Sequence, residues 1–399
     1  MISKPNLCNM KQGWEIKKLG EVCEKLTDGS HNPPKGILHS DYLMLSSQNI
    51  HNDKILFDDV RFLSKDDFIK EDKRTLVREG DILITIVGTI GRCAVFTGNK
   101  TITLQRSVAV LRPQNNISSR YLMYCIIGKN STLNEESHGI AQKGIYLKQL
   151  SQIPIPISQL AEQERIVAEL DCLSGVIEKK KQQLKELDSL AQSIFYEMFG
   201  DPITNEKGWE VKKLGEVCDV RDGTHDSPKY LESSEYALIT SKNITSDGEI
   251  DFNTVNYISK EDYDAINKRS YVSIGDIIMA MIGTIGKPII VKETSRKFCI
   301  KNVALIKFGD SILVSNKYIQ ALLSNNSYAS YIKENNKGGT QKFIALGTIR
   351  NLLTPLPPLS LQQAFASKIE AIEKQKELIK QSIKEVETLF NSRMDYYFN

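Results

Sequence analysis

The chain has 399 residues, enough for two or more domains that each bury a hydrophobic core. Its formal net charge of +3 neither identifies nor excludes a nucleic-acid partner, because a mean charge hides local patches. Seven cysteines without a C-x-x-C pair argue against a disulfide framework and against a zinc site. The sequence shows no signal peptide and no apolar run long enough to span a bilayer. We therefore expect a cytoplasmic protein with no membrane contact and no bound metal.

An internal repeat covers nearly the whole sequence. The segment GWEIKKLGEVCEKLTDGSH at 13–31 returns as GWEVKKLGEVCDVRDGTH at 208–225. Similarly, GDILITIVGTIG at 80–91 returns as GDIIMAMIGTIG at 275–286. The middle of each copy differs far more than its ends. A duplicated scaffold with divergent inserts is typical of two related binding modules that have different targets.

Each copy is expected to mix helices and strands, in the α/β (α+β) class. Short apolar runs rich in β-branched residues predict buried strands, and amphipathic segments that follow a serine predict short helices. Segments containing Pro154 and Pro156, and later Pro355, predict stiff extended links before two long helices. The expected strands are 82–86, 94–96, 108–112, 277–281, 288–291 and 303–308, and the expected short helices are 120–127 and 316–323.

The long helices are predicted from spacing. From Gln163 to Met198, seam residues are alternately three and four apart, as in a coiled coil, and the pattern recurs from Gln362 to Tyr397. A helix of this length, roughly 54 Å, needs a partner, and its copy is the natural one; a buried bundle helix is the alternative. The central seam residues are Leu170, Leu173, Ile177, Lys180, Leu184, Leu187, Ile369, Ile372, Lys376, Ile379, Ile383 and Val386.

These features divide the chain into four parts. We expect globular domains at 1–157 and 200–357, a central helix at 158–199, and a C-terminal helix at 358–399. If the helices pair antiparallel, the two copies are related by a pseudo-two-fold axis. A lysine interrupts each seam, at Lys180 and Lys376, and a polar seam residue can set the register and orientation of the pair.

Several polar turns recur at matched positions and are candidates for contact with DNA. An Asp-Gly-x-His turn with a lysine a few residues later suits contact with a groove or the backbone, although lone histidines are usually structural. The Gly-Thr-Ile-Gly turns could hold a phosphate through backbone amides, but they lack the full nucleotide-binding pattern. These arguments, together with charge and position, select His31, Lys35, Thr89, Arg92, Arg106, Lys143, His225, Lys229, Thr284, Lys287, Lys301 and Lys342.

The sequence provides little support for catalysis. No Ser/His/Asp set, carboxylate pair or metal cluster recurs in both copies. Residues 32–35, Asn-Pro-Pro-Lys, resemble the catalytic loop of adenine methyltransferases, but lysine replaces the aromatic residue and no Gly-rich loop follows a strand before it. We expect a non-catalytic chain with no cofactor of its own.

Taken together, the paired GWE-x-KKLGEV and GDI…GTIG segments and the G-x-x-Q-K passages into the long helices resemble specificity (S) subunits of type I restriction-modification systems. The resemblance covers residues 13–399. It implies two target recognition domains that each read half of a bipartite site in double-stranded DNA, with the antiparallel coiled coil fixing the spacer. It further implies two methyltransferase (M) subunits and restriction (R) subunits as partners. The M subunits would use S-adenosylmethionine, and the R subunits would use ATP and magnesium.

Two other classes remain open from the residues alone. One is a protein–protein scaffold whose two modules bind peptides without DNA sequence specificity, and the other is a two-domain enzyme. DNA retention that weakens steeply with salt would favour the DNA-binding class over both. The bases that are read and the exact spacer length do not follow from the sequence.

Overall fold

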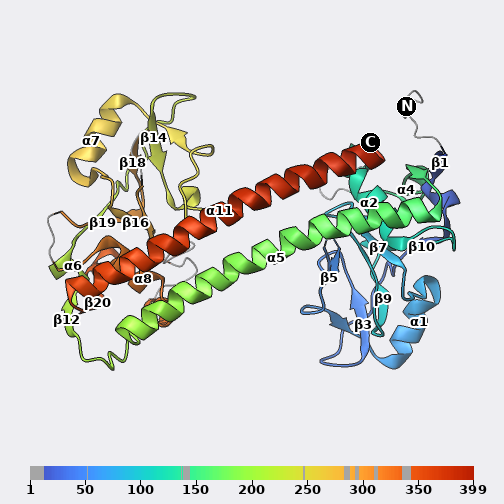
Figure 1. Ribbon diagram of the computed structural model, residues 1–399, viewed down its shortest axis with the longest axis horizontal. Coiled ribbons are helices and arrows are strands. Elements are labelled where there is room, and N and C mark those ends of the chain that lie inside the picture. The colour runs from blue at the N-terminus through green and yellow to red at the C-terminus, as the bar shows by residue number, and fades with distance from the viewer. Residues whose placement is uncertain are drawn as a thin grey trace. The chain divides into compact units, whose positions relative to one another are not determined.

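The computed structural model describes residues 13–51, 53–135, 137, 144–245, 248–282, 288–292, 296–309, 313–334 and 343–399. The chain forms two compact units. Unit 1 comprises the residues up to Lys180 together with Gln381–Asn399, and unit 2 comprises Lys181–Lys380. The division falls inside both long helices, so each unit holds a globular part and a segment of each helix (Figure 1). Within the described ranges, no helix is long and apolar enough to cross a membrane.

A four-stranded antiparallel sheet forms the centre of unit 1. Alternate side chains of a strand point to opposite faces, and the central strand β7 is buried on both. Its Ile82 and Ile84 join a core shared with helix α2 (Ser119–Gly128), whereas Leu83 joins a second core on the other face. The strand order is β2 (Cys23–Asp28), β10 (Val108–Pro113), β7 (Ile82–Thr85) and β8 (Cys93–Val95).

A smaller sheet occupies the part of unit 1 that differs most between the two copies. Strands β3 and β9 of this sheet are parallel, and helix α1 (Lys65–Thr75) packs beside them (Figure 1). Ser64 caps α1 by accepting a hydrogen bond from the backbone N–H of Asp67. The strand order is β6 (Arg61–Phe62), β3 (Tyr42–Leu45) and β9 (Thr101–Leu104), and a separate hairpin joins β4 (Ile50–His51) to β5 (Lys54–Ile55).

Unit 2 has the same two sheets, with α7 (Lys260–Ser270) and α8 (Asn316–Ser324) in the roles of α1 and α2. The divergent middles therefore keep one fold despite their different sequences. The larger sheet has the order β13 (Asp219–Asp222), β19 (Val303–Lys307), β16 (Ile277–Ala280) and β17 (Pro288–Ile290). The smaller sheet has the order β15 (Asn256–Tyr257), β14 (Tyr236–Ile239) and β18 (Lys297–Ile300).

The six expected strands and two expected short helices are confirmed, with each end within one residue of the prediction. The proline-containing segments are extended, as expected, but they are paired strands rather than links. Strand β11 (Pro154–Ile157) pairs antiparallel with β1 (Glu15–Lys18), and β20 (Leu353–Leu356) pairs with β12 (Glu210–Lys213). In β11 the prolines alternate with isoleucines, so the missing N–H groups all lie on one edge of the strand.

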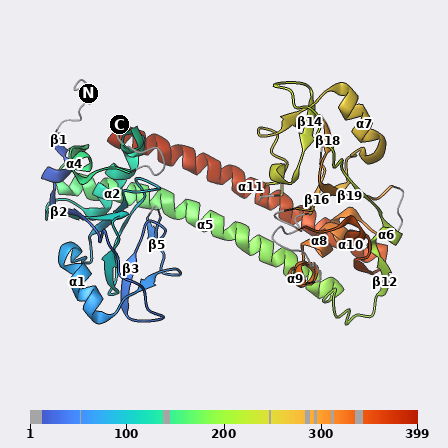
Figure 2. The same ribbon diagram turned by 180° about the vertical axis from the view of Figure 1, so that it is seen from behind.

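Short helical segments complete the described parts of both units. In unit 2, α6 and α10 lie side by side (Figure 2). The segments are η2 (Leu19–Glu21), α3 (Asn130–Glu135), α4 (Leu147–Leu150), α6 (Leu214–Val217), η3 (Ser241–Asn243), α9 (Asn326–Glu334) and α10 (Leu346–Arg350).

The two long helices, α5 (Leu160–Phe199) and α11 (Leu359–Phe398), have 40 residues each. In unit 1 they run antiparallel, because residues with higher numbers in α5 contact residues with lower numbers in α11. Arg165 donates to the Tyr397 hydroxyl at 3.3 Å, and Glu169 binds Arg393 at 2.5 Å.

The same antiparallel pairing holds in unit 2. The Lys376 ammonium lies 2.5 Å from the Asp188 carboxylate, and the rings of Phe199 and Phe365 are 5.1 Å apart. At this end of α5 the buried residues are Phe195 and Phe199, each one position after the expected seam residues Ile194 and Met198. The two rings pack around Phe365 in the core of unit 2. None of the central seam residues named above is exposed.

Each long helix is tied to its globular part by a fully buried glutamine near its first turn. The Gln163 carboxamide accepts from the Ser118 N–H at 3.0 Å and donates to the carbonyls of Ser158 and Asn116 at 2.9 and 3.3 Å. Gln362 makes the equivalent three bonds in unit 2, to the backbone of Ser315, Pro357 and Leu313. The repeated glutamine is therefore a structural residue.

Candidate nucleic-acid interface

In unit 1, a buried carboxylate at the end of β2 holds two exposed basic side chains. Asp28 is 7% exposed, and its carboxylate lies 2.9 Å from His31 Nε2. The other carboxylate oxygen accepts from the guanidinium of Arg74, in the last turn of α1. The side chains of His31 and Arg74 remain 56% and 51% exposed. Asp28 therefore positions two side chains that can bind an anion at the surface.

Unit 2 has the same arrangement with one addition. Asp222 holds His225 Nε2 at 2.8 Å and also accepts from Arg269, whose side chain is 64% exposed. The other ring nitrogen of His225 lies 3.0 Å from the side-chain oxygen of Asn302. These two hydrogen bonds raise the pKa of His225 above its ordinary value. The bond to Asn302 makes the larger contribution, and the bond to Asp222 makes the next largest.

The glycine of each Asp-Gly-x-His turn lets the turn approach a neighbouring strand. A Cβ at Gly29 would lie 2.1 Å from the carbonyl oxygen of Leu104, and one at Gly223 would lie 2.3 Å from that of Ile300. Any side chain at these positions would collide with backbone, so the close approach requires glycine. The turn therefore packs directly against the end of the smaller sheet, at Leu104 of β9 in unit 1 and at Ile300 of β18 in unit 2.

Three loops of unit 1 meet at the connection between β9 and β10. The Arg106 N–H donates to the Ser30 carbonyl at 2.8 Å, which joins this connection to the Asp-Gly-x-His turn. Ser107 accepts at its hydroxyl from the Ser47 N–H at 3.1 Å and at its carbonyl from the Ile86 N–H at 2.9 Å. The turns at 29–31, 46–49 and 86–92 therefore share one surface region.

Unit 2 has the same junction at residues 301–302. The Asn302 N–H donates to the Thr224 carbonyl at 3.2 Å, and the Lys301 N–H donates to the Ile239 carbonyl at 2.8 Å. Lys301 itself is only 9% exposed, and its ammonium donates to the Ser227 hydroxyl at 2.5 Å. This hydrogen bond fixes the position of Ser227, two residues before Lys229 in the same loop.

Of the described candidates of unit 1, His31, Thr89, Arg92 and Arg106 lie in these turns or in the β9–β10 connection, whereas Lys35 lies on the loop that follows His31. His31, Lys35, Thr89 and Arg106 are exposed, and Arg92 is half-buried. In unit 2, His225 and Lys229 are exposed. The candidates Lys143, Thr284, Lys287 and Lys342 lie outside the described residues.

Sequence reasoning missed Arg74 and Arg269. Each follows a lysine, and the two Lys-Arg pairs are 195 residues apart, the spacing of the repeat itself. That recurrence inside otherwise divergent segments was the available signal. A guanidinium has five N–H donors, and Arg74 uses two groups, Nη2 toward Asp28 and Nε toward Thr27. The remaining donors suit a phosphate oxygen.

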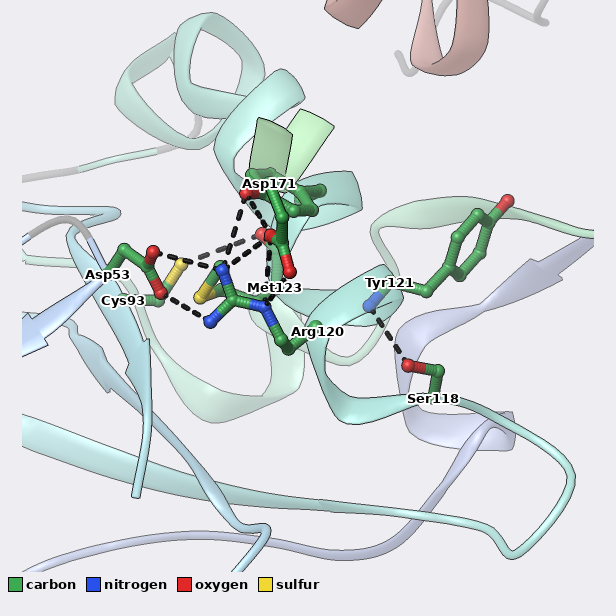
Figure 3. A network of polar contacts seen from close by, with 8 residues as sticks. Asp53, Cys93, Ser118, Arg120, Tyr121, Met123 and Asp171 are labelled. Carbon is green, nitrogen blue, oxygen red and sulfur yellow. Dashed lines mark hydrogen bonds and ion pairs between the residues drawn. The ribbon is translucent and has the colours of Figure 1, made fainter. Parts of the chain in front are cut away.

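A polar network joins the hairpin between β4 and β5, helix α2 and helix α5 in unit 1 (Figure 3). The Arg120 guanidinium donates to both carboxylate oxygens of Asp53 at 2.8 and 3.0 Å, and its Nε lies 2.9 and 3.0 Å from those of Asp171. Tyr124 also donates to Asp171, at 2.6 Å. Burial opposes the charge of Arg120, but these carboxylates raise its pKa overall.

In unit 2, Lys317 takes the place of Arg120, and within the described residues it makes one ion pair. Lys317 of α8 lies 2.5 Å from Glu373 of α11. Arg120 therefore bonds two carboxylates, whereas its counterpart Lys317 bonds one. Among the residues that the structure describes, no group of three His, Cys, Asp or Glu side chains could hold a metal ion.

The fold and the site define a duplicated α+β protein whose two units each present a loop surface with basic side chains. The sequence matches the family described as type I restriction modification DNA specificity domain, over residues 11–189 and again over 206–388. The chain belongs to this family, which confirms the resemblance found in the sequence.

Known proteins agree with this assignment. The type I restriction enzyme MjaVIII specificity subunit of Methanocaldococcus jannaschii is 26% identical over 364 residues, covering 81% of each chain. The MjaIX specificity subunit of the same organism is 24% identical over 396 residues, covering 90% of this chain and 86% of the relative.

Two solved structures share the fold. The S subunit of a type I restriction-modification system from M. genitalium has a TM-score of 0.54 at 11% identity, with 97% of this chain and 96% of that chain covered. A chain from a study of complex assembly and conformational transition of the type I R-M system has a TM-score of 0.56 at 18% identity, with 98% and 99% covered. These likenesses confirm the predicted fold class.

Proposed function

We propose that this chain is the DNA-recognition subunit of a type I restriction-modification complex, in which each unit reads half of a bipartite site. The observation that carries the proposal is the duplicated surface in which a buried aspartate presents a histidine and an arginine. In protein–DNA complexes, phosphate contacts position the protein and base contacts specify the sequence. The constant Asp-His-Arg cluster suits the first role, and the divergent loops beside it suit the second.

The long helices are proposed to fix the spacer between the half-sites. A helix of 40 residues is roughly 60 Å long, and one turn of B-DNA is about 34 Å, so paired helices can bridge sites about a turn apart. Inserting whole helical turns between residues 170 and 190, with a matched insertion in α11, should change the spacer length and leave the half-site letters intact. Changed letters would contradict the proposal.

The segments that begin each repeat are proposed to dock two methyltransferase subunits, and restriction subunits join that complex. Ile16 of β1 and Val211 of β12 occupy equivalent positions, and each is 41% exposed. Matched apolar residues at the surface of both copies suit two identical partners. In this proposal the chain itself performs no catalysis. The methyltransferase subunits bind S-adenosylmethionine, and the restriction subunits bind ATP and magnesium.

The test is co-expression with the cognate methyltransferase, followed by mapping of methylated sites across the host genome. A split motif with a fixed spacer is expected, and exchange of residues 13–157 for those of a relative should replace one half-site only. DNA affinity of the purified complex should fall steeply with salt. A continuous motif, or no motif despite a stable complex, would contradict the proposal and favour a protein scaffold.

A further inference from the structure

The loop that follows the cationic turn is anchored in the same way in both units. In unit 1, the Ile37 N–H donates to the Phe62 carbonyl at 2.9 Å, and in unit 2 the Leu231 N–H donates to the Tyr257 carbonyl at 2.9 Å. These bonds fasten each loop to the edge strand of the smaller sheet. Ile37 and Leu231 therefore occupy equivalent positions.

A serine fixes the far end of each loop. The Ser40 hydroxyl lies 2.7 Å from the Leu63 carbonyl, and the Ser234 hydroxyl lies 2.8 Å from the Ile258 carbonyl. Two residues lie between these anchors in each unit. Because both ends are bonded, the residue directly after the first anchor has an equivalent position in the two units. That residue is Leu38 in unit 1 and Glu232 in unit 2.

The two equivalent positions project into solvent and carry opposite chemistry. Leu38 is 99% exposed and belongs to no hydrophobic cluster of the described residues. Glu232 is exposed, and its carboxylate has no hydrogen bond or ion pair within the described ranges. An anchored loop that holds a leucine entirely in water gains nothing for folding, since the side chain buries no apolar area.

The chemistry of DNA accounts for both residues. The thymine methyl group is the apolar feature of the major groove, and the cytosine amino group is a donor that a carboxylate accepts from. A carboxylate close to a phosphate would be repelled, so an exposed, unpaired glutamate at a DNA interface suits a base edge rather than the backbone. In each unit the loop begins at the histidine of the cationic cluster, His31 or His225, and the residue in question, Leu38 or Glu232, lies seven positions further along it.

We propose that Leu38 and Glu232 are equivalent base-discriminating residues, with Leu38 contacting a thymine methyl in one half-site and Glu232 accepting from a cytosine amino group in the other. This inference rests on the proposed function and names two of its specificity residues. The constant cluster would then hold the backbone while one variable side chain on each loop distinguishes bases.

The experiment uses the complex with its methyltransferase and a duplex carrying its mapped site. Each thymine of the half-site read by unit 1 is replaced in turn by deoxyuridine, which removes only the methyl group. Wild-type affinity should fall about fourfold at one position, the value of one buried methyl group, and a Leu38→Ala complex should show no loss there. Ile69→Ala, at an equally apolar residue of α1 that is 51% exposed, should retain the wild-type loss.

Glu232→Leu should relax the preference for cytosine at one position of the other half-site by about fivefold or more, whereas Glu261→Leu on α7 should not. If no deoxyuridine position weakens wild-type binding, or if the variants weaken all sequences equally, the inference is overturned. Because the deoxyuridine scan needs no variant, it stands even if a substitution impairs folding. A complex that shows no bipartite site at all would instead overturn the proposed function.

Discussion

The buried glutamine at the start of α5 offers a test of how each unit is held to its helix. Gln163 is fully buried, and its carboxamide makes three hydrogen bonds, all to backbone groups that precede α2 and α5. Replacement by alanine leaves the Ser118 N–H and two carbonyls without their partner. We expect Gln163→Ala to destabilise unit 1 and to loosen the attachment of α5.

The magnitude follows from these groups. A buried donor or acceptor left unsatisfied costs about 1–3 kcal/mol, and a carbonyl with a second lone pair costs toward the lower end. Adding about 1 kcal/mol for each of the two carbonyls and about 0.8 kcal/mol for the one methylene that alanine lacks gives about 4–6 kcal/mol. Gln163→Glu keeps the shape and the acceptor but loses the amide donor, so it should also destabilise the unit.

The two tryptophans allow this loss to be assigned to one unit, because Trp14 lies in unit 1 and Trp209 in unit 2. In a Trp209→Phe background, urea unfolding followed by fluorescence reports on unit 1. Lys179→Ala, at an exposed position of α5 within unit 1, is the control and should change the free energy of unfolding by no more than about 0.5 kcal/mol. A Gln163→Ala loss under about 1 kcal/mol would refute the reasoning.

Three further predictions concern the charged network and the cationic turns. Arg120→Met should destabilise unit 1 by about 1–3 kcal/mol, allowing for its partial exposure, and Lys317→Met should cost unit 2 less because one ion pair is lost rather than two; equal losses in urea unfolding would argue against this. The raised pKa of His225 means that its stabilising effect is complete below the ordinary value of 6.5 and is lost as pH rises through the folded-state pKa. An NMR titration should find that pKa above 6.5, and Asn302→Ala should lower it; an unchanged pKa would show that Asn302 is not the cause. Gly29→Ala should destabilise unit 1 by about 2–3 kcal/mol through its clash with Leu104, whereas Gly175→Ala, in open space on α5, should stabilise by up to about 1 kcal/mol. Similar melting temperatures for the two alanine variants would contradict the clash.

Elements that depend on local pattern were predicted well. The strands at 82–85 and 277–280 and both long helices follow from the spacing of apolar residues, because that spacing reflects which face of an element is buried. The proline segments show the limit of this approach. Their extended backbone was predictable, but pairing of β11 with β1 joins residues some 140 positions apart along the chain, as in Lys17 with Ile155.

The candidate site shows the same division. His31 and His225 were found because their motif repeats, while Arg74 was missed although it shares a carboxylate with His31. Arg74 is 46 residues from Asp28, and only packing of α1 against the smaller sheet brings the two together. Lys301 was selected by charge, yet the fold buries it against Ser227. A residue's charge is visible in a sequence, whereas its exposure depends on which elements cover it.

The sequence by itself therefore determined the duplication, the two long helices, the main strands and the family. These properties are repeats and periodicities, which can be recognised from the order of residues along the chain. Only the tertiary structure decided which loops meet at the β9–β10 connection, which cations share a carboxylate, and that Leu38 and Glu232 occupy the same exposed position. Such contacts are non-local, and the side chains that make them acquire their positions only when the sheets and helices have packed.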